Sequence, residues 1–361
     1  MLDKILRSIS FVAALAALAG CGANPTPAPT PIPPPLAKEL TMYNWTDYMP
    51  QSVLDAFRAE YGVKVNLVTY DSQEEAVANI EAGKVAYDVA VIDNDLLPSL
   101  VADNLLAEIN YRNVPNFKNI AADFRDLACD PGNRHSVPNG WGTTGLLVRS
   151  DLVQTPVTGW ADLWDARYAG RIGMREEPTE LISVALKSLG YPLNSEDPAQ
   201  LEAASARLLE LKKSIVFVES QETEAVKHLT SGDVVIMLGY SGDALIDREQ
   251  NPAIQYVLPK EGTMLWGDSF VISAASPNQY TAELFLNFLL RPEISAQIVE
   301  TYYYPTANEA ARPFIDPDIL NDPVVYPPVG YLTHNDFYVP LSPEGEKRYH
   351  QIWQRFQAAK Q

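Results

Sequence analysis

The fold of this chain is decided at Tyr43-Asn44-Trp45-Thr46-Asp47-Tyr48-Met49-Pro50. An apolar stretch before it, Glu39 to Tyr43, is typical of a strand, and Pro50 is a favoured residue in the first turn of a helix. The loop between them holds an indole, a hydroxyl, a carboxylate and a phenol. That mixture suits a cation held between apolar walls better than it suits a core. The segment therefore predicts a binding cleft for a small organic cation.

The composition is that of a globular protein large enough for two domains. The chain has 361 residues, of which 47% are hydrophobic and 20% charged. Acidic residues number 46 against 27 basic ones, giving a formal net charge of −19. Such a charge repels nucleic acid and attracts cations. A need for solubility explains the net charge equally well, so only the positions of the acidic residues can indicate a binding site for a cation.

The N-terminus has the pattern of an export signal. Lys4 and Arg7 precede an apolar run, Ile9 to Ala19, that is too short to span a bilayer. Leu18-Ala19-Gly20-Cys21 resembles the lipobox of bacterial lipoproteins, in which the cysteine becomes the lipid-bearing first residue. We expect residues 1–20 to be a signal peptide and Cys21 the lipid attachment site, with a soluble secretion signal as the weaker alternative.

Residues 21–37 are rich in proline and predict an extended tether between the anchor and the folded body. The second cysteine, Cys129, has no partner in the chain once Cys21 carries lipid, so we predict a structural thiol and no disulfide. The expected location is the periplasmic or extracytoplasmic face of the membrane, and the only expected membrane contact is the lipid anchor.

Beyond Leu36 strands and helices alternate, which predicts parallel sheets covered by helices on both faces. The first helix should run from Pro50 to Tyr61 with Gly62 as its stop, and Ser72 with Glu75 forms a capping box for the second. The remaining expected strands are residues 63–67, 87–92, 146–149, 171–174, 215–218, 234–238 and 254–258; the remaining helices lie near 177–180, 197–213, 280–290, 292–301 and 345–358.

Polar and aromatic residues follow several of these strands. Asp93-Asn94-Asp95 comes after one, Tyr240 and Asp243 follow another, and Trp266 and Asp268 lie beside a third. Ligands in open α/β sheets bind outside the carboxyl ends of the strands. These residues should therefore share one rim with the Trp45 to Tyr48 loop.

Several motifs match known functional patterns only in part. Gly140-Trp141-Gly142-Thr143-Thr144-Gly145 matches the dinucleotide pattern, but a Pro138-Asn139 turn precedes it and a strand follows. Gly239 to Asp243 lacks the last glycine of a nucleophile elbow. The four histidines are scattered, so zinc is not expected. No cofactor or metal is predicted.

Two alternatives stay open on the residues alone. Glu177 and Glu180, one helical turn apart, are a carboxylate pair that an exported glycoside hydrolase would use, or simply favourable charges at a helix N-terminus. Tyr302-Tyr303-Tyr304 offers phenolates to ferric iron, or packing at a domain seam. No nucleophile and base stand out, so we do not expect an enzyme.

The chain resembles the spermidine/putrescine-binding proteins of bacterial ABC importers, which have the type II periplasmic binding-protein fold. The resemblance covers nearly all of the chain after Leu40. It is carried by nine ordered motifs: Tyr43 to Tyr48, Tyr87-Asp88-Val89, Ser136-Val137-Pro138, Gly140 to Thr144, Trp160-Ala161-Asp162-Leu163-Trp164, Pro259-Lys260-Glu261-Gly262, Trp266-Gly267-Asp268-Ser269, Asn287 to Pro292 and Tyr304-Pro305-Thr306.

The resemblance implies a set of ligand-binding residues. Asp47 stands where the family has glutamate, Glu177 replaces an aspartate and Tyr240 a tryptophan. The clearest departure is Asp93-Asn94-Asp95, where polyamine binders resemble Ser-Thr-Tyr. The full predicted set is Trp45, Thr46, Asp47, Tyr48, Asp93, Asp95, Glu177, Glu180, Tyr240, Asp243, Trp266, Asp268 and Tyr304.

The fold implied is two doubly wound α/β lobes joined by a hinge, with the ligand cleft between them. Lobe 1 should comprise residues 38–144 and 268–312, and lobe 2 residues 145–267 and 313–361. The function implied is capture of a polyamine and its delivery to ABC-importer permease subunits by a monomer. A binding protein for ferric iron or another organic amine is the alternative.

Overall fold

The computed structural model describes residues 33–219, 222–328, 330–332 and 337–359. The chain divides into an N-terminal unit, residues 1–35, and a folded unit, Leu36–Gln361. The predicted signal peptide, Cys21 and the tether as far as residue 32 lie outside the described residues. All that follows concerns the folded unit.

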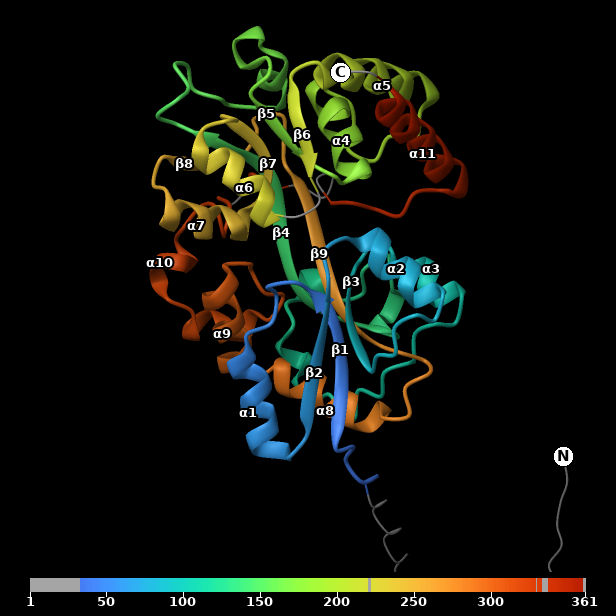
Figure 1. The fold of residues 1–361 in the computed structure, drawn as a ribbon. Helices are drawn as coiled ribbons and strands as arrows, with labels where there is room; N and C mark the ends of the chain where they lie inside the picture. The colour runs from blue at the N-terminus through green and yellow to red at the C-terminus, as the bar shows by residue number, and fades with distance from the viewer. Residues whose placement is uncertain (1–32, 220–221, 329, 333–336, 360–361) are drawn as a thin grey trace, which may run out of the picture. The chain divides into compact units, whose positions relative to one another are not determined.

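One mixed sheet of nine strands, counted over the described residues, runs through the folded unit (Figure 1). The strand order is β2-β1-β3-β9-β4-β7-β5-β6, and β8 pairs with β4. The strands are β1 Glu39–Trp45, β2 Lys64–Tyr70, β3 Val89–Asp93, β4 Ser136–Arg149, β5 Ile172–Arg175, β6 Ile215–Glu219, β7 Ile236–Tyr240, β8 Ile254–Val257 and β9 Met264–Ile272.

Parallel pairing, as predicted, joins β1 to β2 and β3, and joins β5 to β6 and β7. The centre of the sheet is different, because β9 pairs antiparallel with β3 and β4, and β4 pairs antiparallel with β7 and β8. The prediction of parallel sheets was therefore wrong at β4 and β9, the two strands that connect the parallel parts.

Strand β4 also corrects the predicted turn at Pro138-Asn139. The strand is continuous from Ser136 to Arg149, and its pairing with β9 shifts register between Pro138 and Trp141. A bulge tolerates a proline that has no N–H to donate, so the chain bends here without turning back. The glycines of the dinucleotide-like motif lie inside this strand, where no helix follows them.

The helices agree closely with the sequence prediction at their caps. Gly62 adopts φ 70° and ends α1, and the Ser72 hydroxyl accepts a hydrogen bond from the Glu75 amide at 3.2 Å. No helix within the described ranges is long and apolar enough to cross a membrane. The helices are α1 Gln51–Tyr61, α2 Gln73–Glu81, α3 Leu97–Ala102, α4 Pro178–Ser188, α5 Pro198–Lys212, α6 Glu222–Ser231, α7 Ser241–Gln250, α8 Gln279–Leu289, α9 Pro292–Tyr302, α10 Pro317–Leu320 and α11 Pro343–Ala358.

Alternation along the strands buries both faces of the sheet at each end. In β3, Val89 and Val91 pack with α1 and α8, whereas Ala90 and Ile92 pack with α2 and α3. In β7, Ile236 and Leu238 pack with α4, α5 and α11, whereas Met237 packs with α6 and α7.

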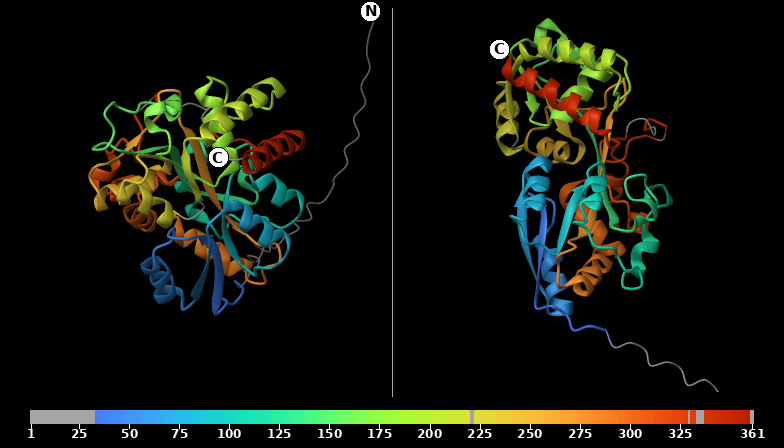
Figure 2. Two further views of the ribbon diagram at one scale, coloured as in Figure 1. Left: turned by 45° about the horizontal axis from the view of Figure 1, so that its top comes forward. Right: turned by 90° about the vertical axis from the view of Figure 1, so that its right-hand side faces the viewer.

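The hydrophobic clusters thus form two groups, one at each end of β4 and β9. Figures 1 and 2 show α1 and α8 at one end of the unit and α4, α5 and α11 at the other. Each group draws on segments far apart in the chain. The residue limits of the two lobes given above stay a prediction.

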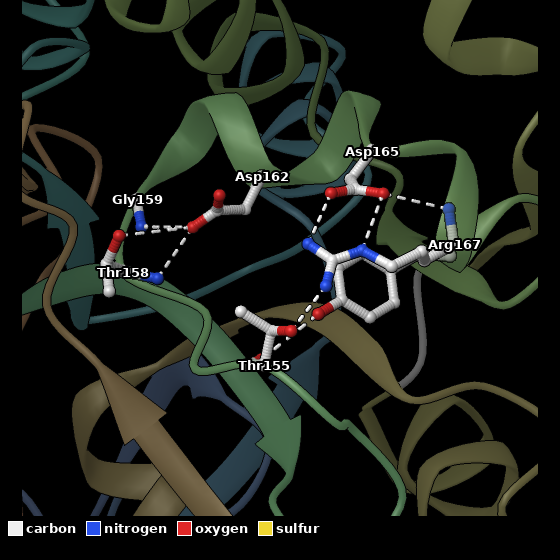
Figure 3. Close-up of polar contacts among 7 residues, drawn as sticks. Thr155, Thr158, Gly159, Asp162, Asp165 and Arg167 are labelled. Atoms are coloured by element: carbon white, nitrogen blue, oxygen red, sulfur yellow. Dashed lines mark hydrogen bonds and ion pairs between the residues drawn. The ribbon is translucent and has the colours of Figure 1, made fainter.

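Some motifs that carried the family resemblance are structural. The Asp162 carboxylate accepts hydrogen bonds from the amides of Thr158 (2.7 Å) and Gly159 (3.1 Å), and the Asp165 carboxylate accepts from the Arg167 side chain (Figure 3). The buried Trp160 donates its indole N–H to the carbonyl of Gly262 at 2.8 Å. These contacts fix the loop between β4 and β5.

Candidate ligand-binding cavity

A cavity of about 1780 Å³ is lined by residues from both groups of elements. It is larger than the usual 300–1000 Å³ of small-molecule sites, as expected of a cleft that is open to solvent. Every residue of the predicted ligand-binding set lines it: Trp45, Thr46, Asp47, Tyr48, Asp93, Asp95, Glu177, Glu180, Tyr240, Asp243, Trp266, Asp268 and Tyr304.

The strand ends bring these residues together. Trp45 is the last residue of β1, Asp93 the last of β3 and Tyr240 the last of β7. Trp266 and Asp268 lie within β9 rather than beside it, and Asp268 pairs directly with Asp93 across the strands. The carboxyl ends of β1, β3 and β7 thus lie near the antiparallel strands β4 and β9.

Asp93 and Asp268 form a buried carboxyl pair. Burial, and then the neighbouring Asp268 carboxyl, raises the pKa of Asp93 well above its usual value. Burial also raises the pKa of Asp268, while the neighbouring Asp93 carboxyl and Tyr48 hydroxyl lower it. Two buried carboxyls side by side repel each other when both are ionised, so the charge of each disfavours ionisation of the other.

The Asp268 carboxylate still lacks a full set of partners. Asp268 is 2% exposed, and within the described residues its Oδ1 atom has no hydrogen bond of good geometry, although the Tyr48 hydroxyl lies close by. Gln73 donates to Asp93 Oδ1 at 3.2 Å, which holds the other carboxyl in place. A buried acceptor facing a cavity is suited to a ligand donor.

Glu180 forms a second carboxylate position, in the first turn of α4. The Thr144 hydroxyl donates to Glu180 Oε1 at 2.8 Å, and the Tyr240 hydroxyl donates to Oε2 at 3.3 Å. Burial, and then the Glu180 charge, raises the pKa of Tyr240, so the phenol stays neutral and remains a donor. Glu177 lies at the N-cap of the same helix.

Asp243 forms a third position, in the first turn of α7. Its carboxyl accepts a hydrogen bond from the Tyr304 hydroxyl. Burial is the main reason that the pKa of Asp243 is raised, and the Tyr304 hydrogen bond and the Arg175 charge oppose that shift. The nearby negative charge and burial together keep Tyr304 protonated.

Four aromatic rings connect the three positions. The Trp266 ring centroid lies 5.8 Å from that of Tyr240 and 5.2 Å from that of Tyr304, and Tyr304 lies 5.4 Å from Tyr48. Each tyrosine hydroxyl is directed to a different carboxyl, with Tyr240 beside Glu180, Tyr304 beside Asp243 and Tyr48 beside Asp268. The cavity therefore combines an apolar aromatic wall with three separate anionic positions.

The loop between β1 and α1 is less buried than the rest of the site. Thr46 and Asp47 line the cavity but are exposed, and Asp47 adopts φ 52°, which is unusual for a residue other than glycine. Asn94 holds the Asp93 to Asp95 segment against β9, because its Oδ1 atom accepts a hydrogen bond from the Ser269 hydroxyl at 2.7 Å. Asp95 lines the cavity beside Asp93.

Two buried charged residues of the cavity, Arg175 and Asp247, are absent from the predicted set. Arg175 ends β5 and is buried, with its guanidinium 5.1 Å from the centre of the Tyr240 ring. Asp247 lies one helical turn after Asp243 and is also buried. Arg175 follows an apolar strand like other site residues, and Asp247 has i,i+4 spacing to Asp243, so both carried a signal that was not used.

The three adjacent tyrosines weighed for a ferric site face different surroundings. The Tyr303 hydroxyl donates to Glu249 at 2.7 Å on the surface, whereas Tyr304 faces the cavity. Within the residues that the structure describes, no group of three or more His, Cys, Asp or Glu side chains is placed to hold a metal ion.

Comparison with known proteins agrees with the cavity. Residues 52–326 match the family of bacterial extracellular solute-binding proteins. The spermidine/putrescine-binding periplasmic protein of Escherichia coli is 35% identical over 290 residues, which are 80% of this chain and 83% of that protein. The expected family resemblance is therefore confirmed.

Solved structures give the same result. The spermidine/putrescine ABC transporter substrate-binding protein of Streptococcus pneumoniae superposes with a TM-score of 0.78 at 31% identity, covering 89% of this chain and 99% of that one. The Tp0655 lipoprotein of Treponema pallidum gives 0.77 at 25% identity, covering 88% and 99%. The predicted two-lobed binding-protein fold is confirmed, and the chain belongs to the bacterial extracellular solute-binding protein family.

Proposed function

We propose that this protein captures a polyamine of the putrescine or spermidine type in the aromatic, acidic cavity and delivers it to the permease of an ABC importer. The observation that carries the proposal is the set of three tyrosine–carboxylate pairs around Trp266. Ammonium groups need carboxylate partners, and the methylenes between them need apolar walls.

In the proposed complex Asp268 accepts one ammonium group, and Glu177 and Glu180 accept another. Asp47 or Asp95 serves a terminal ammonium at the exposed side of the cavity. Trp45 and Trp266 contact the methylenes and add cation–π attraction. The protein acts by binding and release, so the proposal includes no catalytic residue.

Cys21 is proposed to carry the lipid that anchors the protein on the periplasmic or extracytoplasmic face of the bacterial cell membrane. The lipobox-like Leu18 to Cys21 segment supports this, as does the structural similarity to a lipoprotein. The folded unit is proposed to work as a monomer.

The function is tested by calorimetry on the delipidated folded unit with putrescine, cadaverine, agmatine and spermidine, using glutamate and a glucoside as controls. We expect saturable one-to-one binding of at least one amine and no heat from the controls. Absence of binding by every amine, in a protein that melts cooperatively, would overturn the proposal.

A further inference from the structure

A buried arginine lies among the acids of the cavity wall. Arg175 is the last residue of β5, is 6% exposed and lines the cavity. Its guanidinium lies 5.1 Å from the centre of the Tyr240 ring, a distance that gives cation–π attraction. The other cationic side chain among the described lining residues, Lys227, is exposed. Arg175 is therefore the one positive charge that the described part of the cavity wall keeps out of water.

Carboxyls approach Arg175 from the N-terminal turns of two helices. Glu177 is the N-cap of α4, Glu180 lies in the first turn of α4, and Asp243 lies in the first turn of α7. Burial lowers the pKa of Arg175, but Tyr240 and these three acids raise it by more. We call the guanidinium and the three carboxyls the Arg175 group. Within this group one positive charge faces three acids.

The geometry fixes the guanidinium inside this group. The Tyr240 hydroxyl donates to Glu180 Oε2 at 3.3 Å, and the ring of the same tyrosine packs against Arg175. A guanidinium does not lose its proton in a protein, so its charge is permanent. The three acids leave room for one further cation. A second one would crowd the guanidinium, and like charges repel strongly in a site that excludes water.

We propose that Arg175 is a specificity-determining residue, whose guanidinium occupies the place in the Arg175 group that an ammonium of a longer amine would take. The cavity then favours a diamine over a triamine. This inference rests on the proposed function and names the ligand class within it. A diamine places one ammonium at Asp268 and the other in the Arg175 group. The third ammonium of a triamine is left with acids nearer to solvent, such as the exposed Asp47, where water screens its charge.

The test is Arg175→Met, which keeps most of the apolar stem and removes the charge. We expect calorimetry to show a rise of about tenfold or more in spermidine affinity relative to putrescine affinity, because the vacated place accepts the third ammonium. Arg175→Lys retains a cation and should retain the wild-type preference for putrescine. The matched control is Arg58→Met, at an exposed arginine of α1 that does not line the cavity. It should leave both affinities unchanged.

An unchanged ratio of the two affinities in folded Arg175→Met would overturn the inference, because an equal gain or loss for both amines indicates a general electrostatic or structural role. An Arg175→Lys variant that behaves like Arg175→Met would also contradict it. If the wild type binds no amine at all, the proposed function has failed instead. Should Arg175→Met not fold, the wild type decides. Tighter binding of putrescine than of spermidine supports the inference, and the reverse order contradicts it.

Discussion

At the scale of single residues, the cavity is governed by carboxyls kept out of water. Asp93, Glu180 and Asp243 accept hydrogen bonds from a side-chain amide or a tyrosine hydroxyl, and the buried Arg175 guanidinium faces Glu180 and Asp243. Neutral donors stabilise a carboxylate without cancelling its charge. The site therefore stays anionic. In return, the pKa values of Asp93, Asp243 and Asp268 are raised, and the carboxyls repel one another in the apo protein.

Asp268→Asn is expected to separate binding from stability. The substitution should lower amine affinity about 10- to 100-fold, because one charge-assisted hydrogen bond is lost. It should leave the melting temperature of the apo protein equal or higher, because Asp93 no longer faces a second carboxyl. Calorimetry and thermal melting measure the two effects. Asp55→Asn, an exposed acid of α1, is the control, and undiminished affinity in folded Asp268→Asn would refute the assignment.

Asp247 predicts a defined dependence of stability on pH. Burial, and then Asp243, raises its pKa from 3.8 to about 7. The folded state therefore binds more protons than the unfolded state between about pH 4 and 7, and stability is lost as the pH rises through that window. Relative to the wild type, apo Asp247→Asn should gain stability from pH 4 to a plateau above pH 7, of about 4 kcal/mol at most.

Chemical denaturation at several pH values measures this difference. The Asp93 and Asp268 pair has the same sign of pKa shift, but it is present in both proteins and cancels. A difference that is constant from pH 4 to 8 would contradict the assignment to Asp247.

Residue types after predicted strands were enough to find several of the acidic and aromatic residues of the cavity from sequence. Asp93 follows the apolar run Val89 to Ile92, and Tyr240 follows an equally apolar β7, so the α/β rule placed them on one rim. Asp247 escaped because Ser241 and Gly242, poor helix formers, do not indicate that a helix begins there.

At the scale of elements, the antiparallel pairing of β4 with β9 builds the centre of the cavity. Gly142 pairs with Trp266, and a Cβ atom at Gly142 would lie 2.3 Å from Cζ2 of the indole. The ring rests on the glycine backbone of the neighbouring strand. Local sequence could not reveal this pairing, because Pro138 and the glycines after it look like a turn.

Gly142→Ala should therefore displace the Trp266 ring. We expect altered tryptophan fluorescence, weaker amine binding and a loss of about 1–3 kcal/mol of stability from overpacking, with the far-UV spectrum retained. Adding Trp266→Phe removes the ring atoms that clash, so the double variant should regain stability relative to Gly142→Ala. A single variant with wild-type fluorescence and affinity would show that the ring does not rest on Gly142 in solution.

At the scale of the whole molecule, two groups of hydrophobic clusters share a cavity larger than its proposed ligand. We expect the two groups to approach each other when a ligand binds to acids of both. Relatives of this fold class close by a hinge, and β4 and β9 are the strands that connect the two groups here.

Ligand binding should therefore compact the protein. We expect small-angle scattering to show a smaller radius of gyration after addition of a saturating amine, and no change for Asp268→Asn at the same concentration. An unchanged radius in a wild type shown by calorimetry to be saturated would argue against hinge closure.

The anchor is tested in cells. Cys21→Ser should abolish labelling by a radioactive or clickable fatty acid and leave unprocessed precursor, because the modified thiol is absent. Membrane fractionation and mass measurement record both effects. Normal lipid labelling of the variant would contradict attachment at Cys21.

The pairing of β3 with β9 governs how the chain can fold during synthesis. The hydrogen bond between Ser269 and Asn94 joins residues 175 positions apart. The N-terminal strands therefore leave the ribosome long before the partner that completes their sheet. Closing so large a loop is slow, so the nascent chain lacks a finished core until most of it has been made. A chain that completes its core this late remains unfolded during synthesis. A translocation channel requires an unfolded substrate of this kind.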